Sequence, residues 1–527
     1  MSTFKVLLTT SGIGSRLGEI TQYTNKALVR IGDKPSISHI IEMYPIGSRF
    51  VVTLGYYGNQ VRDFLEIAYP EITFEFVQVD NYEGEGSSLL YSMLCAKNLL
   101  QEPFIFHACD TIVESQITPP IYNWVAGYKG RGSSNYASIS IIGDSVSEMH
   151  DKGFINSDYL HVGIVGINDF KIFWEIAEKI LEENPNDTTL GDVNILKSLV
   201  KNKKFKINEI SKWHDIGNIR SLEAARTKFK DNDFHVLDKL AESIFKINNC
   251  VIKFFSDSKI LGDRVNRVTY LNNTVPEMLA VKSNFYKYAY VNGELFSKVA
   301  NRSNFIELVQ WAEEKLWVKA KIDSKIFFEN CFDFYVTKTK KRVDEFLLKK
   351  SISDSVTIIN GEYIPTLKEL LSKIDKHDLC NGVPTNFHGD FILDNIIKTG
   401  KKEFKLIDWR QNFSNNLEAG DMYYDLAKLA HNLVVNHEII DNNEFEINID
   451  LDGSVSLNIH RLQTLVDCEN LYFNYLHSNG FNIKKIKLLR AIIWLNMSPL
   501  HNHPFDNFLF HFGKYELHRI INYHEYV

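Results

Sequence analysis

The stretch that organises the first half of the chain is residues 9–17, TTSGIGSRL, which directly follows the apolar run of residues 4–8. An apolar strand that enters a Gly-x-Gly-x-Arg loop is suited to binding phosphates. Gly12 and Gly14 let the backbone turn sharply and point its N–H groups at an anion, and Arg16 adds a forked donor that keeps its charge. An ordinary strand-to-helix turn can carry the same two glycines, so the residues that follow decide between the two interpretations.

The loop continues through residues 16–28, RLGEITQYTNKAL. This pattern resembles the signature of the sugar-phosphate and phosphocholine nucleotidyltransferase family, which makes nucleoside-diphosphate sugars and CDP-alcohols. Asn25 stands where that family usually has proline, which alters how Lys26 is presented but leaves the charges in place. The resemblance implies nucleotide-binding roles for Ser11, Gly12 and Gly14 and catalytic roles for Arg16 and Lys26.

Length and composition indicate a globular protein with more than one domain. A chain of 527 residues exceeds one ordinary core, and about 100 to 200 residues per domain predicts two to four domains. The net charge of −7 argues against a nucleic-acid partner, since proteins that bind phosphate backbones usually carry a basic excess. The short basic run of residues 338–342 is expected to be a solvated helix face.

Cysteine spacing and hydropathy bear on the compartment. The six cysteines show no C-x-x-C pair, which predicts reduced thiols rather than disulfides or a zinc site. The first apolar run is only strand length, and no run approaches a membrane span. We therefore expect a cytoplasmic protein with small-molecule substrates, no nucleic-acid partner and no membrane insertion, and the sequence leaves open a homo-oligomer.

Helices and strands are predicted to alternate after the opening loop. Residues 35–44 and 57–67 read as helices, and residues 50–54 and 72–77 read as strands. Such alternation predicts a parallel sheet with crossover helices, whose ligands bind at the carboxyl ends of the strands. For residues 1–230 we predict the α/β class, with a Rossmann-like, mixed and mostly parallel sheet.

A second glycine loop lies in residues 80–92, DNYEGEGSSLLYS, and opens a predicted helix. In the family that the first loop resembles, an amide side chain stands five residues before a glycine, and the two hold the nucleobase. Asn81 and Gly86 have that spacing. A surface turn with a serine helix cap is the alternative interpretation.

Two aspartates are candidates for a metal site. Residues 103–111 form a buried-looking strand that leads to Asp110, and residues 213–217 read WHDIG, with Asp215 at the centre. An aspartate at the carboxyl end of a parallel strand faces the ligand crevice, and the resemblance implies that this pair holds Mg²⁺. A single such aspartate is as often a helix cap, but the pair follows the loop motifs in the order that the family has.

A third segment, residues 148–153 (EMHDKG), precedes a predicted strand at residues 161–167. Its place in the order resembles the segments with which such enzymes hold the second substrate. Lys152 is therefore the candidate for binding the acceptor phosphate, and a solvated surface lysine is the alternative.

The two halves are predicted to be joined by a charged helix over residues 219–240. Residues 243–255 then read as a hairpin with Asn248 and Asn249 at the turn. Lys253 stands inside its apolar second strand, where a lysine needs an anionic partner.

The most specific motif of the chain is residues 386–397, NFHGDFILDNII, followed by the apolar strand of residues 404–409, FKLIDW. H-G-D-x-x-x-x-N with a later I-D-W closely resembles the aminoglycoside phosphotransferase and choline kinase family, which has a protein-kinase-like α+β fold. The resemblance implies that Asp390 accepts the proton of an attacking hydroxyl and that Asn395 and Asp408 hold Mg²⁺ on ATP.

The match to the kinase family has gaps. No glycine-rich loop precedes Lys253, the candidate ATP lysine, and the next helix carries Arg264 and Arg267 rather than an acidic partner. Residues 285–295 resemble the hinge-like strand beside the adenine. Asp425, in a G-D-x-x-x-D-L-A segment, is expected to cap a helix and support the catalytic loop, and His388 is expected to brace that loop.

Together the resemblances divide the chain into residues 1–230, a nucleotidyltransferase domain, and residues 235–527, a kinase-like domain. They imply a bifunctional, Mg²⁺-dependent enzyme that phosphorylates a small alcohol of the choline or ethanolamine kind with ATP. The phosphomonoester is then coupled to a nucleotide, with CTP favoured, giving a CDP-alcohol and pyrophosphate for a surface polysaccharide or lipid.

Two alternatives stay open at this point. The first is a sugar 1-kinase fused to a nucleoside-diphosphate-sugar pyrophosphorylase, since both families include enzymes that act on sugars. The second is that one domain is catalytically inactive and serves as a scaffold or sensor, which the missing glycine loop motivates.

Overall fold

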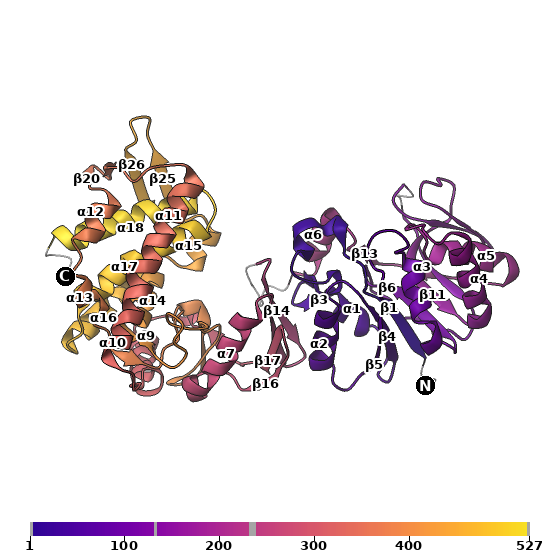
Figure 1. Ribbon diagram of the computed structural model, residues 1–527, viewed down its shortest axis with the longest axis horizontal. Helices are drawn as coiled ribbons and strands as arrows, with labels where there is room; N and C mark the ends of the chain where they lie inside the picture. The colour runs from indigo at the N-terminus through magenta and orange to yellow at the C-terminus, as the bar shows by residue number, and fades with distance from the viewer. Residues whose placement is uncertain (1–3, 131–133, 231–238, 524–527) are drawn as a thin grey trace. The chain divides into compact units, whose positions relative to one another are not determined.

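The computed structural model describes residues 4–130, 134–230 and 239–523. The chain forms two compact units (Figure 1). One contains Met1–Leu261 and Met278–Ala289, and the other contains Gly262–Glu277 and Tyr290–Val527. In the described part of the chain, no helix is both long and apolar enough to cross a bilayer.

The first unit is built on a nine-stranded sheet. Four strands at one side are mutually parallel, in the order β5 (Thr73–Gln78), β4 (Arg49–Leu54), β1 (Lys5–Thr9) and β6 (Phe104–Ala108). β11 (Tyr159–Ile167) runs antiparallel to β6, and beyond it follow β8 (Trp124–Tyr128), β12 (Lys206–Ile210), β10 (Ser145–His150) and β9 (Ser138–Ile142).

The sequence predicted a mostly parallel sheet, but parallel pairing does not predominate. Outside the first four strands, only β8 and β12 pair in parallel among the described strands of this sheet. β9 and β10 are joined by two residues, which is too short for the crossover that parallel strands require. The predicted mixed α/β class holds.

Both faces of the central strand β1 are buried. Val6 and Leu8 belong to an apolar cluster that includes residues of α1 (Ser36–Ile41) and α2 (Gly58–Ala68). Leu7, on the opposite face, belongs to a second cluster formed with α3 (Leu89–Cys95), α4 (Phe170–Glu183) and α5 (Asp192–Asn202). A strand covered on both faces reads as a continuous apolar run, which explains why the sequence identified it.

A smaller sheet in the first unit has the order β14 (Glu242–Ile247), β15 (Cys250–Phe255), β17 (Phe285–Ala289) and β16 (Met278–Val281). The predicted hairpin is confirmed: Ile247 pairs with Cys250, and Asn248 takes a left-handed φ of 53°. Phe64 of α2 packs against Phe245 of this sheet, with ring centroids 5.5 Å apart.

Two predicted elements differ from the structure. The helix expected over residues 219–240 is α6 (Ile219–Lys228), which ends earlier, and residues 231–238 lie outside the described residues. The single strand expected over residues 285–295 is two strands in different sheets, β17 and β18 (Glu294–Leu295), because β18 pairs with β22 (Ile396–Gly400).

The second unit is mainly helical. α17 (Ile483–Met497) is buried along most of its length and contacts α14 (Met422–Asn432), α18 (Phe505–Asn522) and α11 (Lys338–Lys350). These helices are drawn in orange and yellow in Figure 1. β22 directly follows the segment with the H-G-D motif and forms a three-stranded sheet with β18 and β23 (Glu403–Leu406). The helix α7 (Ser258–Leu271) contacts that segment through Arg267, whose Nη1 donates to the His388 carbonyl over 3.5 Å.

Candidate active sites

The glycine loop and Asp110 start at the same edge of the sheet. Thr9 and Ala108, the last residues of parallel neighbours β1 and β6, are in register, so the segments that follow them emerge side by side. Gly14 has a φ of 74°, and a Cβ there would lie 3.0 Å from the Cβ of Lys26. The glycine is therefore required twice, by conformation and by space.

Apolar packing beneath the loop sets the position of the charged groups. Leu17 is buried in a small cluster with Ile112 and Ile216, and these two residues lie close in sequence to Asp110 and Asp215. β13 (Trp213–Asp215) pairs with β7 (Thr111–Val113), which places Asp215 opposite Thr111. The two carboxylates are thus carried by neighbouring strands.

The two aspartates and the arginine converge beside Gly217. A Cβ added to Gly217 would lie 3.1 Å from Asp215 Oδ1, and 3.3 Å from both Asp110 Oδ2 and Arg16 Nη2. Lys26 Nζ lies 3.4 Å from Asp110 Oδ2, and Arg16 Nη2 lies 3.9 Å from it. The structure therefore brings together four of the residues that the sequence predicted to act on phosphates.

Charge pairing controls the ionisation of this group. The charge of Lys26 lowers the pKa of Asp110 despite burial of the carboxyl group, and Arg16 adds to that effect. Burial opposes the charge of Lys26, but Asp110 and Cys109 together outweigh the burial and raise the lysine's pKa. The described residues contain no group of three potential metal-ligating side chains. Two carboxylates nevertheless fit Mg²⁺, which usually takes one or two carboxylates together with water and substrate phosphates.

Sequence reasoning missed two residues that hold Asp215. Tyr136 Oη donates to Asp215 Oδ2 over 2.9 Å, and Asn218 Nδ2 donates to the same oxygen over 3.2 Å. Asn218 stands directly after the W-x-D-x-G motif and could have been noticed there. Tyr136 lies 79 positions away in sequence, where no local signal marks it.

The side chain of Asn25 holds the turn that leads into Lys26. Its buried side-chain amide donates to the carbonyls of Thr10, over 2.8 Å, and Tyr56. Its Oδ1 accepts from the N–H of Ala27 over 2.8 Å. These hydrogen bonds fix the turn that presents Lys26, as the ring of a proline would by restricting φ.

The remaining predicted residues of the first unit lie as follows. Asn81 and Gly86 are adjacent: Gly86 has a φ of 80°, and a Cβ there would lie 3.0 Å from Asn81 Nδ2. Ser11 Oγ is hydrogen-bonded to Ser92 Oγ over 2.8 Å, and Gly12 faces open space. Lys152 is exposed in the turn after β10, and its role stays a prediction.

In the second unit, Asp425 holds the H-G-D loop. Its two carboxylate oxygens accept hydrogen bonds from the backbone N–H groups of His388 and Gly389, each over 2.7 Å. Burial raises the pKa of Asp425 to about 6, although these donors act in the opposite direction. Asp425 supports the loop as predicted, but the prediction that it caps a helix is wrong: it lies in the first turn of α14, whose N-cap is Asp421.

A side-chain hydrogen bond also ties the H-G-D loop to the residue that follows β23. The His388 ring nitrogen Nε2 is hydrogen-bonded to the Ile407 carbonyl over 2.9 Å, which agrees with the bracing role predicted for this histidine. Gly389 has a φ of 83°, and a Cβ there would lie 2.6 Å from the Cβ of Arg410. Only glycine fits at that position.

Asp390 has two side-chain partners. Asn395 Nδ2 donates to Asp390 Oδ2 over 3.1 Å, and Lys428 Nζ of α14 lies 2.8 Å from Oδ1. Burial raises the pKa of Asp390, but the lysine overcomes this and the resulting pKa is about 2. Lys428 was missed from the sequence, although it stands three positions after Asp425 and hence on the same side of the helix.

Asp408 completes this second group. It has a φ of 58°, in the left-handed region, and Asn395 accepts a backbone hydrogen bond from the preceding Ile407 over 2.9 Å. Arg264 Nη1 of α7 lies 2.5 Å from Asp408 Oδ1. Asp390 and Asn395 are hydrogen-bonded to each other, and Asp408 directly follows the residue whose backbone bonds to Asn395. All three side chains carry oxygen atoms of the kind that Mg²⁺ binds.

Lys253 lies in β15 of the small sheet and is buried. Its backbone pairs with Ile244 on one side and Tyr286 on the other. Its assignment as the ATP lysine stays a prediction.

Comparisons with known proteins bear on the N-terminal part of the chain. No family model matches. The chain is 26% identical over 246 residues to "Bifunctional protein GlmU" of Methanococcus vannielii, covering 44% of this chain and 56% of that protein. It is 25% identical over 213 residues to the protein of that name from Methanocaldococcus jannaschii, covering 39% of this chain and 50% of that one. The chain thus spans about half the length of these curated relatives.

Solved structures match the same part. One is a putative glucose-1-phosphate thymidylyltransferase from Bacillus anthracis, with 22% identity and a TM-score of 0.38, covering 44% of this chain and 98% of that one. Another is the CTP:phosphocholine cytidylyltransferase of Streptococcus pneumoniae, with 18% identity and a TM-score of 0.36, covering 44% of this chain and all of that one. The curated relatives thus match the part of the chain for which the sequence predicted the likeness to nucleotidyltransferases.

Proposed function

We propose that the first unit is a nucleotidyltransferase in which a phosphomonoester oxygen attacks the α-phosphorus of a nucleoside triphosphate. The new P–O bond forms as the bond to the β-phosphate breaks, and pyrophosphate leaves. The observation that carries this proposal is the convergence of Asp110, Asp215 and Arg16 beside Gly217, at the edge of the sheet where the glycine loop begins.

The residues of this site answer the main difficulty of the reaction, which is that two anions must approach each other. Arg16 and the N–H groups of the glycine loop bind the triphosphate, and Lys26 stabilises the charge on the reacting phosphoryl group. Asp110 and Asp215 would hold Mg²⁺, which neutralises phosphate charge when it is bound. Asn81 with Gly86 would hold the base, and Lys152 would bind the acceptor phosphate.

We also propose that the second unit is a small-molecule kinase. A hydroxyl oxygen attacks the γ-phosphorus of ATP, the bond to the β-phosphate breaks, and ADP leaves. Asp390 accepts the hydroxyl proton; with a pKa of about 2 it is a weak base, so it mainly orients the hydroxyl until the proton becomes acidic late in the reaction. Asn395 and Asp408 would hold Mg²⁺ on ATP.

The two activities make a sequence in which the kinase produces the phosphomonoester that the transferase consumes. A choline- or ethanolamine-like alcohol with CTP is the substrate pair that the sequence resemblance favours, for a surface polysaccharide or lipid. A sugar 1-kinase with a nucleoside-diphosphate-sugar pyrophosphorylase is the alternative pair.

One contact favours a second candidate function, a catalytically inactive second unit that serves as a scaffold or sensor. Arg264 binds the Asp408 carboxylate that a magnesium ion would need. The intact network of Asp390, Asn395 and Lys428 argues for activity.

The test uses the full chain in two assays. With ATP, Mg²⁺ and a panel of alcohols, amines and sugars, release of ADP measures the kinase. With phosphomonoesters and each of CTP, UTP, GTP and dTTP, release of pyrophosphate measures the transferase and identifies its nucleotide. No ADP release together with no ATP binding would favour the scaffold.

A further inference from the structure

The two carboxylate oxygens of Asp215 have different partners. Oδ2 accepts hydrogen bonds from Tyr136 Oη, over 2.9 Å, and from Asn218 Nδ2, over 3.2 Å. Oδ1 accepts one bond, from the backbone N–H of Gly217 over 3.0 Å. An ionised carboxylate offers about four lone-pair positions. Counting the donors in the described part of the chain, the two side chains fill Oδ2, whereas Oδ1 keeps one position.

The oxygen that keeps a position borders the other carboxylate of the site. A Cβ added to Gly217 would lie 3.1 Å from Asp215 Oδ1 and 3.3 Å from Asp110 Oδ2, so both oxygens face the same space. Mg²⁺ requires near-octahedral coordination at about 2.0 to 2.1 Å, and a ligand must therefore present its lone pair in one direction. The terminal torsion of an aspartate has a broad energy minimum, so other groups must fix that direction.

Strand β11 places Tyr136 beside Asp215. The carbonyl of the residue after Tyr136 accepts a hydrogen bond from the His161 N–H of β11 over 2.8 Å. Thr111, which pairs with Asp215, donates from its hydroxyl to the Val162 carbonyl of β11 over 2.6 Å. The tyrosine and the aspartate are thus anchored to adjacent residues of one strand, although they are 79 positions apart in sequence.

The ring of Tyr136 is directed by an indole. It packs on Trp213 with ring centroids 4.7 Å apart and an interplanar angle of 70°. Trp213 stands two positions before Asp215 in β13, so the two side chains lie on the same face of that strand. Burial and the charge of Asp215 raise the pKa of Tyr136 to about 12, and the hydroxyl stays a donor at neutral pH.

We propose that Tyr136 is a positioning residue of the transferase site, whose hydroxyl holds Oδ2 of Asp215 so that Oδ1 is presented to a divalent ion. This inference rests on the proposed nucleotidyltransferase function of the first unit and assigns the oxygen with which Asp215 would bind Mg²⁺. Replacing a residue that orients a metal ligand typically costs about 10- to 100-fold in metal affinity or activity. Because Asn218 still holds Oδ2, the loss of the Tyr136 hydroxyl should lie at the lower end of that range.

The first test removes the hydroxyl from the full chain and keeps the ring. Tyr136→Phe should retain its melting temperature and its KM for the phosphomonoester. The Mg²⁺ concentration for half-maximal pyrophosphate release should rise about tenfold. Tyr128→Phe is the matched control, because Tyr128 packs on the same indole of Trp213, with centroids 5.8 Å apart, and is not among the described donors to Asp215. It should leave the Mg²⁺ requirement unchanged.

The second test measures metal binding without turnover. Electron paramagnetic resonance of Mn²⁺, with CTP and no phosphomonoester, gives the dissociation constant of the ion. Every protein in this measurement carries Asp408→Asn, which weakens the second proposed metal site, and Asp110→Asn identifies the signal of the first. Tyr136→Phe should raise the Mn²⁺ dissociation constant about tenfold.

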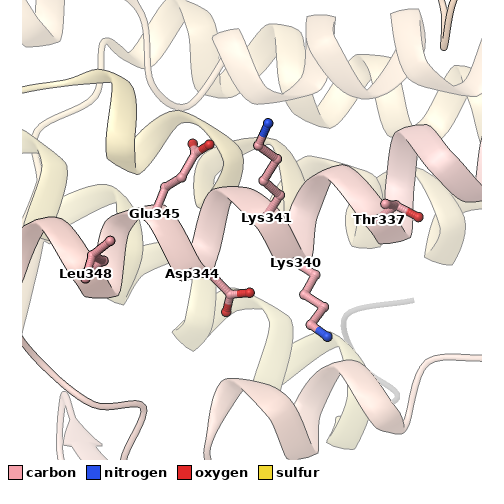
Figure 2. A pocket seen from close by; sticks show the side chains of 6 residues that line it. All are labelled: Thr337, Lys340, Lys341, Asp344, Glu345 and Leu348. Carbon is pink, nitrogen blue, oxygen red and sulfur yellow. The ribbon is translucent and has the colours of Figure 1, made fainter.

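Helix α11 supplies a control for Mn²⁺ held by surface carboxylates. A shallow hollow on this helix is lined by Thr337, Lys340, Lys341, Asp344, Glu345 and Leu348. Lys340 and Lys341, from the basic run of residues 338–342, are exposed and belong to the solvated face that the sequence predicted. Figure 2 shows Asp344 projecting to the same side of the helix as Lys340. Asp344→Asn removes this exposed carboxylate and should leave the Mn²⁺ dissociation constant unchanged.

Three results would overturn the inference. Unchanged Mg²⁺ and Mn²⁺ values in Tyr136→Phe, in a chain that releases pyrophosphate, would retain the transferase and exclude the positioning role. Equal losses in Tyr136→Phe and Tyr128→Phe would assign the effect to packing around Trp213. Mn²⁺ binding that Asp110→Asn does not weaken would remove the metal site itself. In contrast, Mn²⁺ binding that Tyr136→Phe weakens, without pyrophosphate release from any phosphomonoester, would support the role of Tyr136 and overturn the transferase proposal.

Discussion

Asn25 holds the turn before Lys26 with the hydrogen bonds of one side chain. Proline restricts φ through its ring, whereas the Asn25 side chain reaches the same end with hydrogen bonds to the backbone at Thr10, Tyr56 and Ala27. The sequence motif showed only that the proline was missing. It could not show the substitute, because two of the three partners come from segments 15 and 31 positions away.

Replacing this amide should therefore affect stability and presentation of Lys26 together. Asn25→Ala leaves two carbonyls and one N–H without their partner, and we expect it to destabilise the first unit by about 1 to 3 kcal/mol. Thermal unfolding measures the loss, and pyrophosphate release should fall with it. Asn25→Pro, the control, should retain more transferase activity than Asn25→Ala; equal activity would contradict the role assigned to the turn.

At the scale of elements, the sequence correctly predicted those helices and strands whose apolar periodicity reflects which of their own residues are buried. β4, α2 and β5 lie where the alternation predicted them. The prediction failed where the pairing partner of a strand decides its sheet or its direction. β18 belongs to a different sheet from β17 because it pairs with β22, and β11 runs antiparallel to β6. Such choices depend on strands more than a hundred positions away or on the length of connections, which local propensity does not encode.

The end of β6 carries a pH-dependent contact. His107 is fully buried, with Nδ1 hydrogen-bonded to Tyr44 Oη over 2.8 Å and Nε2 to the Thr111 carbonyl over 2.9 Å. Burial lowers its pKa to about 4. Because the folded state favours the neutral ring, its contribution to stability is present above the unfolded pKa of about 6.5 and is lost as the pH falls toward 4.

We expect the free energy of unfolding of the first unit to fall by up to about 3 kcal/mol between pH 6.5 and pH 4 through this residue. Urea unfolding at a series of pH values measures the change. In His107→Gln, which does not titrate, the slope over this interval should be shallower than in the unchanged protein. An identical slope would assign the pH dependence to other groups.

At the scale of the whole molecule, the chain carries two groups of carboxylates in two compact units. Asp110 and Asp215 belong to the first, and Asp390 and Asp408 to the second. Each group is held by its own strands and loops. The sequence identified most members of both groups from motifs, while Tyr136 and Lys428, which position them, emerged only from the fold.

The two activities should accordingly be separable by single substitutions. We expect Asp390→Ala to abolish ADP release and leave pyrophosphate release from a supplied phosphomonoester unchanged. Asp110→Ala should do the reverse, since it removes a carboxylate from the other site. Both assays on both variants provide the measurement, with far-ultraviolet circular dichroism as the folding control. Loss of both activities from either substitution would contradict independent sites.

Gly217 offers a way to distinguish crowding from charge. Its hydrogen atoms border the space that Asp110, Asp215 and Arg16 share, so an added methyl group would occupy that space while every ionised group stays present. We expect Gly217→Ala to retain its melting temperature but to require more Mg²⁺ for half-maximal pyrophosphate release. An unchanged Mg²⁺ requirement would mean that the ion binds elsewhere. A raised Mg²⁺ requirement would mean that selection must preserve the empty space beside Gly217 as well as the two carboxylates.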